Sequence, residues 1–171
     1  VVILLVGAPL AYLLARGRVP GGKFVETLVD LPMVLPPAVA GLGLLMAFGR
    51  RGIVGTFLND IGITVGFTPW AVIIAQTFVA TPFFVRSARA GFTRVDRALE
   101  EAAADLGAPP RTVFRTVTLP MALPGIAAGA VLAWARAIGE FGATIMFARN
   151  FPGRTQTMSL AIYGRYEGGD L

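Results

Sequence analysis

The chain of 171 residues is 55% hydrophobic and only 15% charged, whereas charged residues make up about 25% of a soluble domain. Cysteine and histidine are both absent, which removes disulfides, thiolate nucleophiles, imidazole bases and the usual zinc ligands. The formal net charge of +5 comes from basic residues scattered among apolar runs, a pattern typical of membrane topology and not of a nucleic-acid-binding face. We therefore expect a single membrane domain, residues 1–171, with no catalytic residues, metal ligands or cofactors.

The first run, residues 1–15 (VVILLVGAPLAYLLA), is entirely apolar. Because a spanning helix needs about 20 apolar residues, we expect this run to be the inner part of a span whose beginning is missing. A signal peptide is the alternative, but no basic segment precedes the run, and Arg16 and Arg18 follow it.

A glycine-rich pattern that resembles a nucleotide-binding loop follows the first run, but it lacks the hydroxyl residue that binds magnesium. Residues 17–23 (GRVPGGK) fit G-x-x-x-x-G-K, yet Phe24 stands where a P-loop needs Ser or Thr for magnesium. A presumed membrane helix also precedes the pattern in place of a strand. A glycine-rich, positively charged turn is the better interpretation.

Three further apolar runs are long enough to cross a bilayer. Residues 31–49 and 67–85 each provide 19 uncharged residues, or about 28 Å of helix against roughly 30 Å of hydrocarbon. The third, residues 116–148, is interrupted only by Arg136 and Glu140. The prolines within these runs predict kinked helices that pack together, because neighbouring helices must satisfy the freed carbonyls. The expected fold is an all-α polytopic membrane bundle with about four spans.

Gly125 and Gly129 form a G-x-x-x-G pattern in the third run. This pattern allows helix backbones to approach closely. On its own it is a weak dimer motif, and packing within the chain is favoured over dimerisation.

Positive charge is divided unequally between the loops that alternating spans place on opposite sides. Residues 16–30 and 86–115 carry nine Lys or Arg, and residues 50–66 and 149–171 carry five. The positive-inside rule therefore places the first set in the cytoplasm.

The charged segment 93–119 predicts two short helices joined by a tight turn. Thr93 is the expected N-cap, with Asp96 in the first turn, and Gly107 suits the left-handed position after the first helix. Prolines 109 and 110 open the second helix, which re-enters the membrane near Pro120. An apolar stripe is formed by Val95, Leu99, Ala102 or Ala103, and Leu106. A plain connector needs no such order, so a docking surface is favoured over a connector.

This hairpin resembles the cytoplasmic EAA loop of ABC importer permeases, E-A-A-x3-G-x9-I-x-L-P. The only departure is Val117 in place of Ile. The resemblance implies a type-1 transmembrane domain, with at least one further span after residue 171, and a coupling hairpin that sits in a cleft of the ATPase subunit. The residues that carry this role would be Glu101, Ala102, Ala103, Gly107, Ala108, Leu119 and Pro120.

Other segments look like the molybdate and tungstate permeases. They are residues 30–37 (DLPMVLPP), 48–52 (FGRRG), 135–144 (ARAIGEFGAT), 150–157 (NFPGRTQT) and 161–163 (AIY). Sulfate permeases share a related Gly-Glu-aromatic-Gly segment but usually read differently after it, so the resemblance favours molybdate or tungstate over sulfate or thiosulfate.

Arg136 and Glu140 are four residues apart and can pair on one helix face. If the helix starts at Pro124, Arg136 lies about 18 Å along its axis, where an unpaired charge costs about 2.5–3.5 kcal/mol. One hypothesis places the pair, together with Thr144, along the translocation path or subunit interface. The other is an ion pair near the outer surface that only sets the depth of the helix.

The expected protein is a multi-pass permease subunit of a bacterial or archaeal plasma (inner) membrane. It would form a homodimer, bind two copies of an ATPase and accept an oxyanion from a periplasmic or lipid-anchored binding protein. Two other classes stay open: a membrane-embedded enzyme, disfavoured by the lack of His, Cys and clustered carboxylates, and a non-transporting scaffold, which an uptake assay would distinguish.

Overall fold

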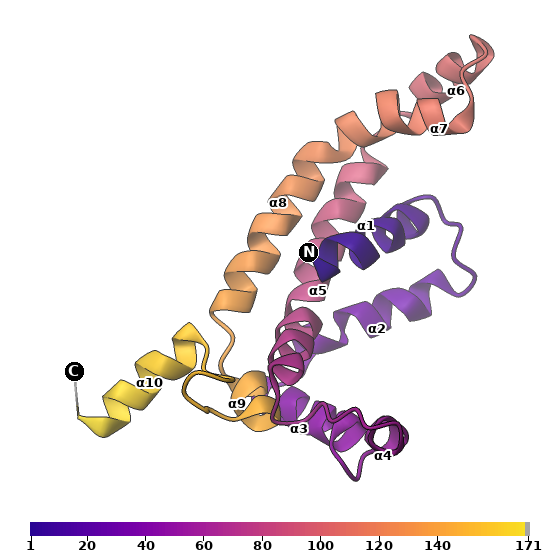
Figure 1. Ribbon diagram of the computed structural model, residues 1–171. Helices are drawn as coiled ribbons and strands as arrows, with labels where there is room; N and C mark the ends of the chain where they lie inside the picture. The colour runs from indigo at the N-terminus through magenta and orange to yellow at the C-terminus, as the bar shows by residue number, and fades with distance from the viewer. Residues whose placement is uncertain (170–171) are drawn as a thin grey trace. The chain divides into compact units, whose positions relative to one another are not determined.

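The computed structural model describes residues 1–169, which are helical and contain no strand (Figure 1). This confirms the predicted all-α fold. In chain order the elements are α1 (Val2–Ala15), α2 (Gly22–Val34), α3 (Pro37–Phe48), α4 (Ile53–Asp60), α5 (Pro69–Thr93), α6 (Arg97–Asp105), α7 (Pro110–Val113), the π-helical turn η1 (Phe114–Thr118), α8 (Leu119–Ile138), α9 (Gly142–Ala148) and α10 (Met158–Gly168).

The helices fall into two compact units, which we call unit 1 and unit 2. Unit 1 contains Val1–Asp30 and Thr81–Ala133, and unit 2 contains Leu31–Ala80 and Trp134–Leu171. The grouping of both units into one permease domain stays a prediction.

Two helical stretches are long and apolar enough to cross a membrane: α5, and the continuous helix Pro110–Ile138 formed by α7, η1 and α8. Helices α2 and α3 pass the same test only as a pair, and α1 is a shorter apolar helix. The four apolar runs of the sequence are therefore all helical, but among residues 1–169 only two of them contain a single helix long enough to span.

The run 31–49 is bent more sharply than the kinked span that we expected, and it is divided between two helices. Its chain bends by 118° between α2 and α3. Proline 36 disfavours the helical region for Leu35, and neither Pro36 nor Pro37 has an N–H to donate, so one helix ends and another begins here.

The run 116–148 is also divided differently from the prediction. Its helix begins at Pro110 and ends at Ile138, and α9 is a separate helix after a short break at residues 139–141. Phe141 has φ −126° and ψ −56°, outside the helical range, which marks the break.

In unit 1 the two glycines of the G-x-x-x-G pattern pack α8 against α5. A Cβ on Gly125 would lie 2.6 Å from the Cα of Gly91, and one on Gly129 would lie 3.0 Å from the carbonyl oxygen of Phe84. The hydroxyl of Ser87 donates to the carbonyl of Gly125 at 2.9 Å. The glycines thus serve packing within the chain, as the favoured interpretation predicted.

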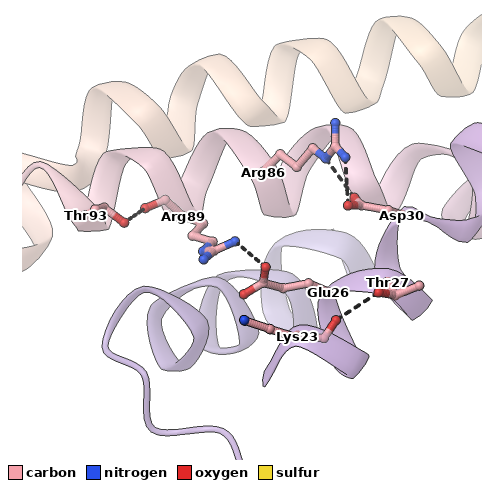
Figure 2. Close-up of polar contacts among 7 residues, drawn as sticks. All are labelled: Lys23, Glu26, Thr27, Asp30, Arg86, Arg89 and Thr93. Carbon is pink, nitrogen blue, oxygen red and sulfur yellow. Dashed lines mark hydrogen bonds and ion pairs between the residues drawn. The ribbon is translucent and has the colours of Figure 1, made fainter. Parts of the chain in front are cut away.

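Ion pairs also join α2 to α5 (Figure 2). The guanidinium of Arg86 donates two hydrogen bonds of 2.7 Å to Asp30, and Arg89 lies 2.9 Å from Glu26. These side chains are partly exposed, so burial adds little to the strength of the ion pairs. The Arg86 contact is the stronger kind because its two hydrogen bonds are bidentate. The pairs therefore link α2 and α5 within unit 1.

Unit 2 is built on close contact between α3 and α9. A Cβ on Gly41 would lie 2.7 Å from the Cα of Ala143, and one on Gly142 would lie 2.8 Å from the Cβ of Pro37. The buried core around this contact consists of Leu44, Val65, Ala71, Ala75, Val79, Ala143, Phe147 and Ala148.

Candidate functional site

The predicted helix–turn–helix is present at residues 97–113. Gly107 has φ +88°, and the amide of Ala108 donates to the carbonyl of Ala103 at 3.1 Å, which closes the end of α6. Most residues with a side chain are strained at this φ, so the turn strongly favours glycine.

The start of the hairpin differs from the prediction at its cap. Thr93 ends α5, and its hydroxyl donates back to the carbonyl of Arg89 at 2.9 Å. Asp96 is the actual N-cap of α6, because its carboxylate accepts the amide of Ala98 at 3.0 Å. Asp and Thr both cap helices, so the sequence alone could not decide between these nearby candidates.

The apolar stripe of α6 is only partly covered. Val95 is buried, whereas Leu99 is 47% exposed and Leu106 is 90% exposed. Glu101 and Ala102 are also exposed, and Ala103 and Ala108 are half-buried. A capped helix with exposed leucines beside a carboxylate is suited to docking on another protein.

The second arm of the hairpin continues directly into the membrane-spanning helix. The amide of Leu119 bonds to the carbonyl of Phe114, five residues earlier, and Pro120 then follows without interrupting the helix. A π turn is a frequent feature of functional sites. Leu119 and Pro120 therefore lie inside one continuous helix. The predicted re-entry point near Pro120 had implied a joint between two elements.

Glu100 is a residue of the site that the sequence did not reveal. Its carboxylate forms an ion pair with Arg16 at the end of α1 and accepts a hydrogen bond from the hydroxyl of Thr118 in η1. The side chains of Arg16 and Glu100 are only 8% and 18% exposed. The helical pattern places Glu100 beside Glu101 on the polar face, and nothing local distinguishes the buried carboxylate from the exposed one.

An aromatic cluster supports the same junction. The ring of Tyr12 in α1 lies edge-on to those of Phe92 and Phe114, each at 5.3 Å between centroids. The guanidinium carbon of Arg16 lies 5.5 Å from the Tyr12 centroid. Stacking and the ion pair together hold α1 against both arms of the hairpin.

In unit 2 the predicted pair of Arg136 and Glu140 forms. Nη1 of Arg136 lies 2.6 Å from Oε2 of Glu140, whose side chain is 1% exposed, and this oxygen makes no further hydrogen bond. The other oxygen, Oε1, accepts the amide of Ala143 at 2.7 Å. Glu140 therefore also caps α9. We did not predict this cap, because the apolar run was interpreted as one continuous helix.

Thr144 lies fully buried in the first turns of α9, near Glu140 in sequence. Its hydroxyl has no hydrogen-bond partner among residues 1–169. Burial of a hydroxyl without a partner costs free energy, so Thr144 is an energetically unfavourable feature of α9 in this structure.

The segment 150–157 is ordered by hydrogen bonds of its own. The hydroxyl of Thr155 accepts the amide of Phe151 and donates to the carbonyl of Arg149, both at 3.1 Å. In α10 the hydroxyl of Tyr163 donates to Glu167 at 2.8 Å, and this bond, with the nearby negative charge, raises the pKa of the tyrosine. In the described part of the chain, no cluster of three or more acidic side chains has the form of a metal site.

Comparison with known proteins identifies a family. Residues 7–167 match the model of the family described as binding-protein-dependent transport system inner membrane component. The molybdenum transport system permease proteins of Mycobacterium tuberculosis and Escherichia coli K12 are each 47% identical, over 95% and 90% of this chain. A probable sulfate transport system permease protein of Chlorokybus atmophyticus is 38% identical over 94%. The chain spans 62%, 67% and 56% of the length of these three relatives, respectively.

Proposed function

Because the chain belongs to the family of binding-protein-dependent transport system inner membrane components, we propose that it is the membrane-spanning subunit of an ATP-driven importer. The observation that carries this proposal is the hairpin at residues 97–113, a capped helix with exposed leucines that continues without a break into a spanning helix. The chain itself would not hydrolyse ATP, and that reaction would belong to a partner.

The hairpin would be the docking site for the ATPase, one copy for each subunit of a homodimer. Leu99 and Leu106 would enter an apolar cleft of the partner, and Glu101 would meet a basic group there. Because α7, η1 and α8 form one helix, a displacement of the hairpin would move the spanning helix with it, as alternating access requires.

The transported substrate would be an oxyanion, molybdate or tungstate, delivered by a periplasmic or lipid-anchored binding protein. The two bacterial relatives at 47% identity, both named for molybdenum transport, support this choice, and the segments 135–144 and 150–157 agree with it. Sulfate or thiosulfate is the second candidate, supported by the relative named for sulfate transport at 38% identity.

Arg136, Glu140 and Thr144 would line the translocation path or the interface between subunits. Arg136, which is 27% exposed and paired with the buried Glu140, is the member of this set that supports such a role over one limited to setting helix depth. An intramembrane ionisable pair is by default a candidate functional site.

The test is anion uptake by the reconstituted complex of full-length permease, ATPase and binding protein. We expect ATP-dependent accumulation of molybdate or tungstate, with little competition from a large excess of sulfate. Equal uptake of sulfate would contradict the substrate assignment. Absence of any ATP-dependent uptake, with all three proteins folded and associated, would favour a scaffold and contradict the importer.

A further inference from the structure

A pocket of about 620 Å³ lies in unit 1 between α1 and the helix that follows the hairpin. The aromatic rings of Tyr12, Phe92 and Phe114 form part of its wall, and Ala8 and Pro9 of α1 extend it. Of these five residues only Phe92 is buried, so the pocket is accessible from outside the unit. A mostly apolar pocket of this size is large enough to hold part of a small amphipathic molecule.

Among the described residues that line this pocket, only two are charged. Arg111 lies in α7 and Arg115 in η1, and both are exposed. Neither guanidinium forms an ion pair within residues 1–169, and no carboxylate lines the pocket. A phosphate group is a strong partner for such a pair, because each guanidinium offers N–H donors that match the phosphate oxygens.

The charged and apolar parts of the wall lie at different depths along the spanning helix. Arg111 and Arg115 stand at the start of the continuous helix Pro110–Ile138, whereas Leu119 and Ile126 line the pocket further along it. The eleven positions from Arg115 to Ile126 correspond to about 16 Å along a helix axis. One leaflet contributes about 15 Å, half of the roughly 30 Å of hydrocarbon in a bilayer. The wall therefore extends over about the depth of one leaflet, with its charge at one end.

We propose that this pocket binds an anionic phospholipid from the leaflet on the hairpin side of the membrane. The phosphate of the headgroup contacts Arg111 and Arg115, and an acyl chain lies along the apolar wall toward Ile126. Basic pockets between spanning helices are typical sites for acidic headgroups on the cytoplasmic side, where the positive-inside rule places the hairpin. The inference goes beyond the proposed function, because it needs only a membrane-embedded chain, which membership of the family supplies.

A phospholipid fits this pocket better than two other kinds of occupant. A free phosphate or molybdate ion would pair with the arginines but would leave the apolar wall uncovered. An apolar helix of another protein would cover the wall but would offer no negative charge to the two guanidinium groups. Met121 and Leu123, further along the same helix, are 45% and 54% exposed, so a lipid can reach this part of unit 1 from the side.

The experiment titrates the full-length permease–ATPase complex in detergent with phosphatidylglycerol and counts bound lipids by native mass spectrometry. Phosphatidylcholine, which has acyl chains but no net charge, is the comparison lipid. We expect saturable binding of phosphatidylglycerol, at least about tenfold tighter than that of phosphatidylcholine. Arg111→Gln with Arg115→Gln should weaken phosphatidylglycerol binding about tenfold to thirtyfold and leave phosphatidylcholine binding unchanged.

Arg18→Gln with Arg94→Gln is the matched control. It removes the same charge from exposed positions of the same unit that do not line the pocket. The control should change the dissociation constant for phosphatidylglycerol by less than about threefold. An equal loss of affinity in both double variants would show unspecific attraction of acidic lipid and would overturn the site.

Ala8→Phe tests the apolar part of the pocket. A larger side chain at this half-buried position takes up space that an acyl chain needs, so the variant should bind phosphatidylglycerol roughly fivefold to tenfold more weakly. The thermal unfolding temperature without added lipid should stay near that of the wild type, because the new ring points into an accessible pocket. Unchanged affinity in this variant and in Arg111→Gln with Arg115→Gln would overturn the inference.

Two further results would assign the pocket to another occupant. Displacement of phosphatidylglycerol by an equal concentration of glycerol 3-phosphate, which has no acyl chain, would make the pocket a site for free anions. Absence of saturable phosphatidylglycerol binding to the wild-type complex would mean that another protein segment covers the pocket. Either result overturns the lipid site and leaves the proposed function intact, since anion uptake is measured separately.

Discussion

Each unit contains a partly buried ion pair, and the two pairs differ greatly in the sequence separation of the residues that they join. The pair of Arg16 and Glu100 joins positions 84 residues apart, and Thr118 adds a third segment through its hydroxyl. The pair of Arg136 and Glu140 joins residues four apart and caps the helix that follows. The first therefore holds the hairpin on its neighbouring helices, whereas the second stabilises a local break in the backbone. Loss of the Arg16–Glu100 pair should affect how movement of the hairpin is transmitted through unit 1. Loss of the Arg136–Glu140 pair should affect the folding of unit 2.

The largest effect is expected from breaking the local pair. Arg136→Met leaves the Glu140 carboxylate, which is 1% exposed, buried without its partner, which costs about 3–5 kcal/mol, so this variant should express poorly and lose most uptake. Glu140→Met should be less damaging, because the Arg136 guanidinium that it leaves unpaired is 27% exposed, although this variant also removes the cap of α9, worth roughly 1 kcal/mol. Detergent-solubilised yield, thermal unfolding and anion uptake measure the outcome.

A double variant provides the control for this prediction. Arg136→Met with Glu140→Gln removes both charges and keeps an oxygen to cap α9, so it should recover stability relative to either single variant. Additive losses would show that the two side chains act independently, which contradicts the pair.

Breaking the pair of Arg16 and Glu100 should lower stability less, and it should change coupling to the ATPase more than folding. We expect Glu100→Gln to lower stability by about 1–3 kcal/mol and to reduce ATP hydrolysis stimulated by loaded binding protein, while ATPase association stays near normal. Glu101→Gln is the matched control, because its carboxylate is exposed and its loss should weaken association instead. The measurements are pull-down of the ATPase and its turnover with and without loaded binding protein. Identical behaviour of the two variants would remove the distinction between holding the hairpin and docking it.

The same two pairs show which contacts can be predicted from the sequence alone and which cannot. The spacing of Arg136 and Glu140 predicts their contact because four residues are one turn of a helix, and Gly107 predicts its positive φ because the turn chemistry is local. The helices, the hairpin and the packing glycines Gly125 and Gly129 follow from similar local patterns.

What the sequence missed depends on tertiary structure. Nothing in the helical pattern separates the buried Glu100 from the exposed Glu101, because the partner Arg16 lies in a distant helix. The break at residues 139–141 was missed because an apolar, glycine-containing run is equally compatible with one long helix or two short ones. Apolarity alone likewise could not show that the run 31–49 bends by 118°.

A smaller perturbation tests the turn that carries the hairpin. At φ +88°, Gly107→Val should cost roughly 1–2 kcal/mol locally and reduce ATPase association, while insertion and dimer formation stay normal. Gly107→Asn is the control, because Asn tolerates this region and should retain most association. No atom of the described chain lies within 4 Å of a Cβ added at Gly107, so any defect would come from backbone strain and not from a clash. Normal coupling in Gly107→Val would reduce the segment 93–119 to a connector.

The least perturbing test uses cysteines to place the hairpin and the segment 150–157 on opposite sides of the membrane. The chain contains no cysteine, so single substitutions report without background. Ala104 in α6 and Gln156 are both exposed, and neither is a positive-φ glycine such as Gly153, so Ala104→Cys and Gln156→Cys should leave stability and uptake almost unchanged. Because the hairpin side carries more Lys and Arg, we expect an impermeant thiol reagent to label position 156 in intact cells and position 104 only after permeabilisation. The reverse pattern would invert the orientation. Labelling of both positions in intact cells would place the hairpin and the segment 150–157 on one side and contradict the odd number of crossings between them.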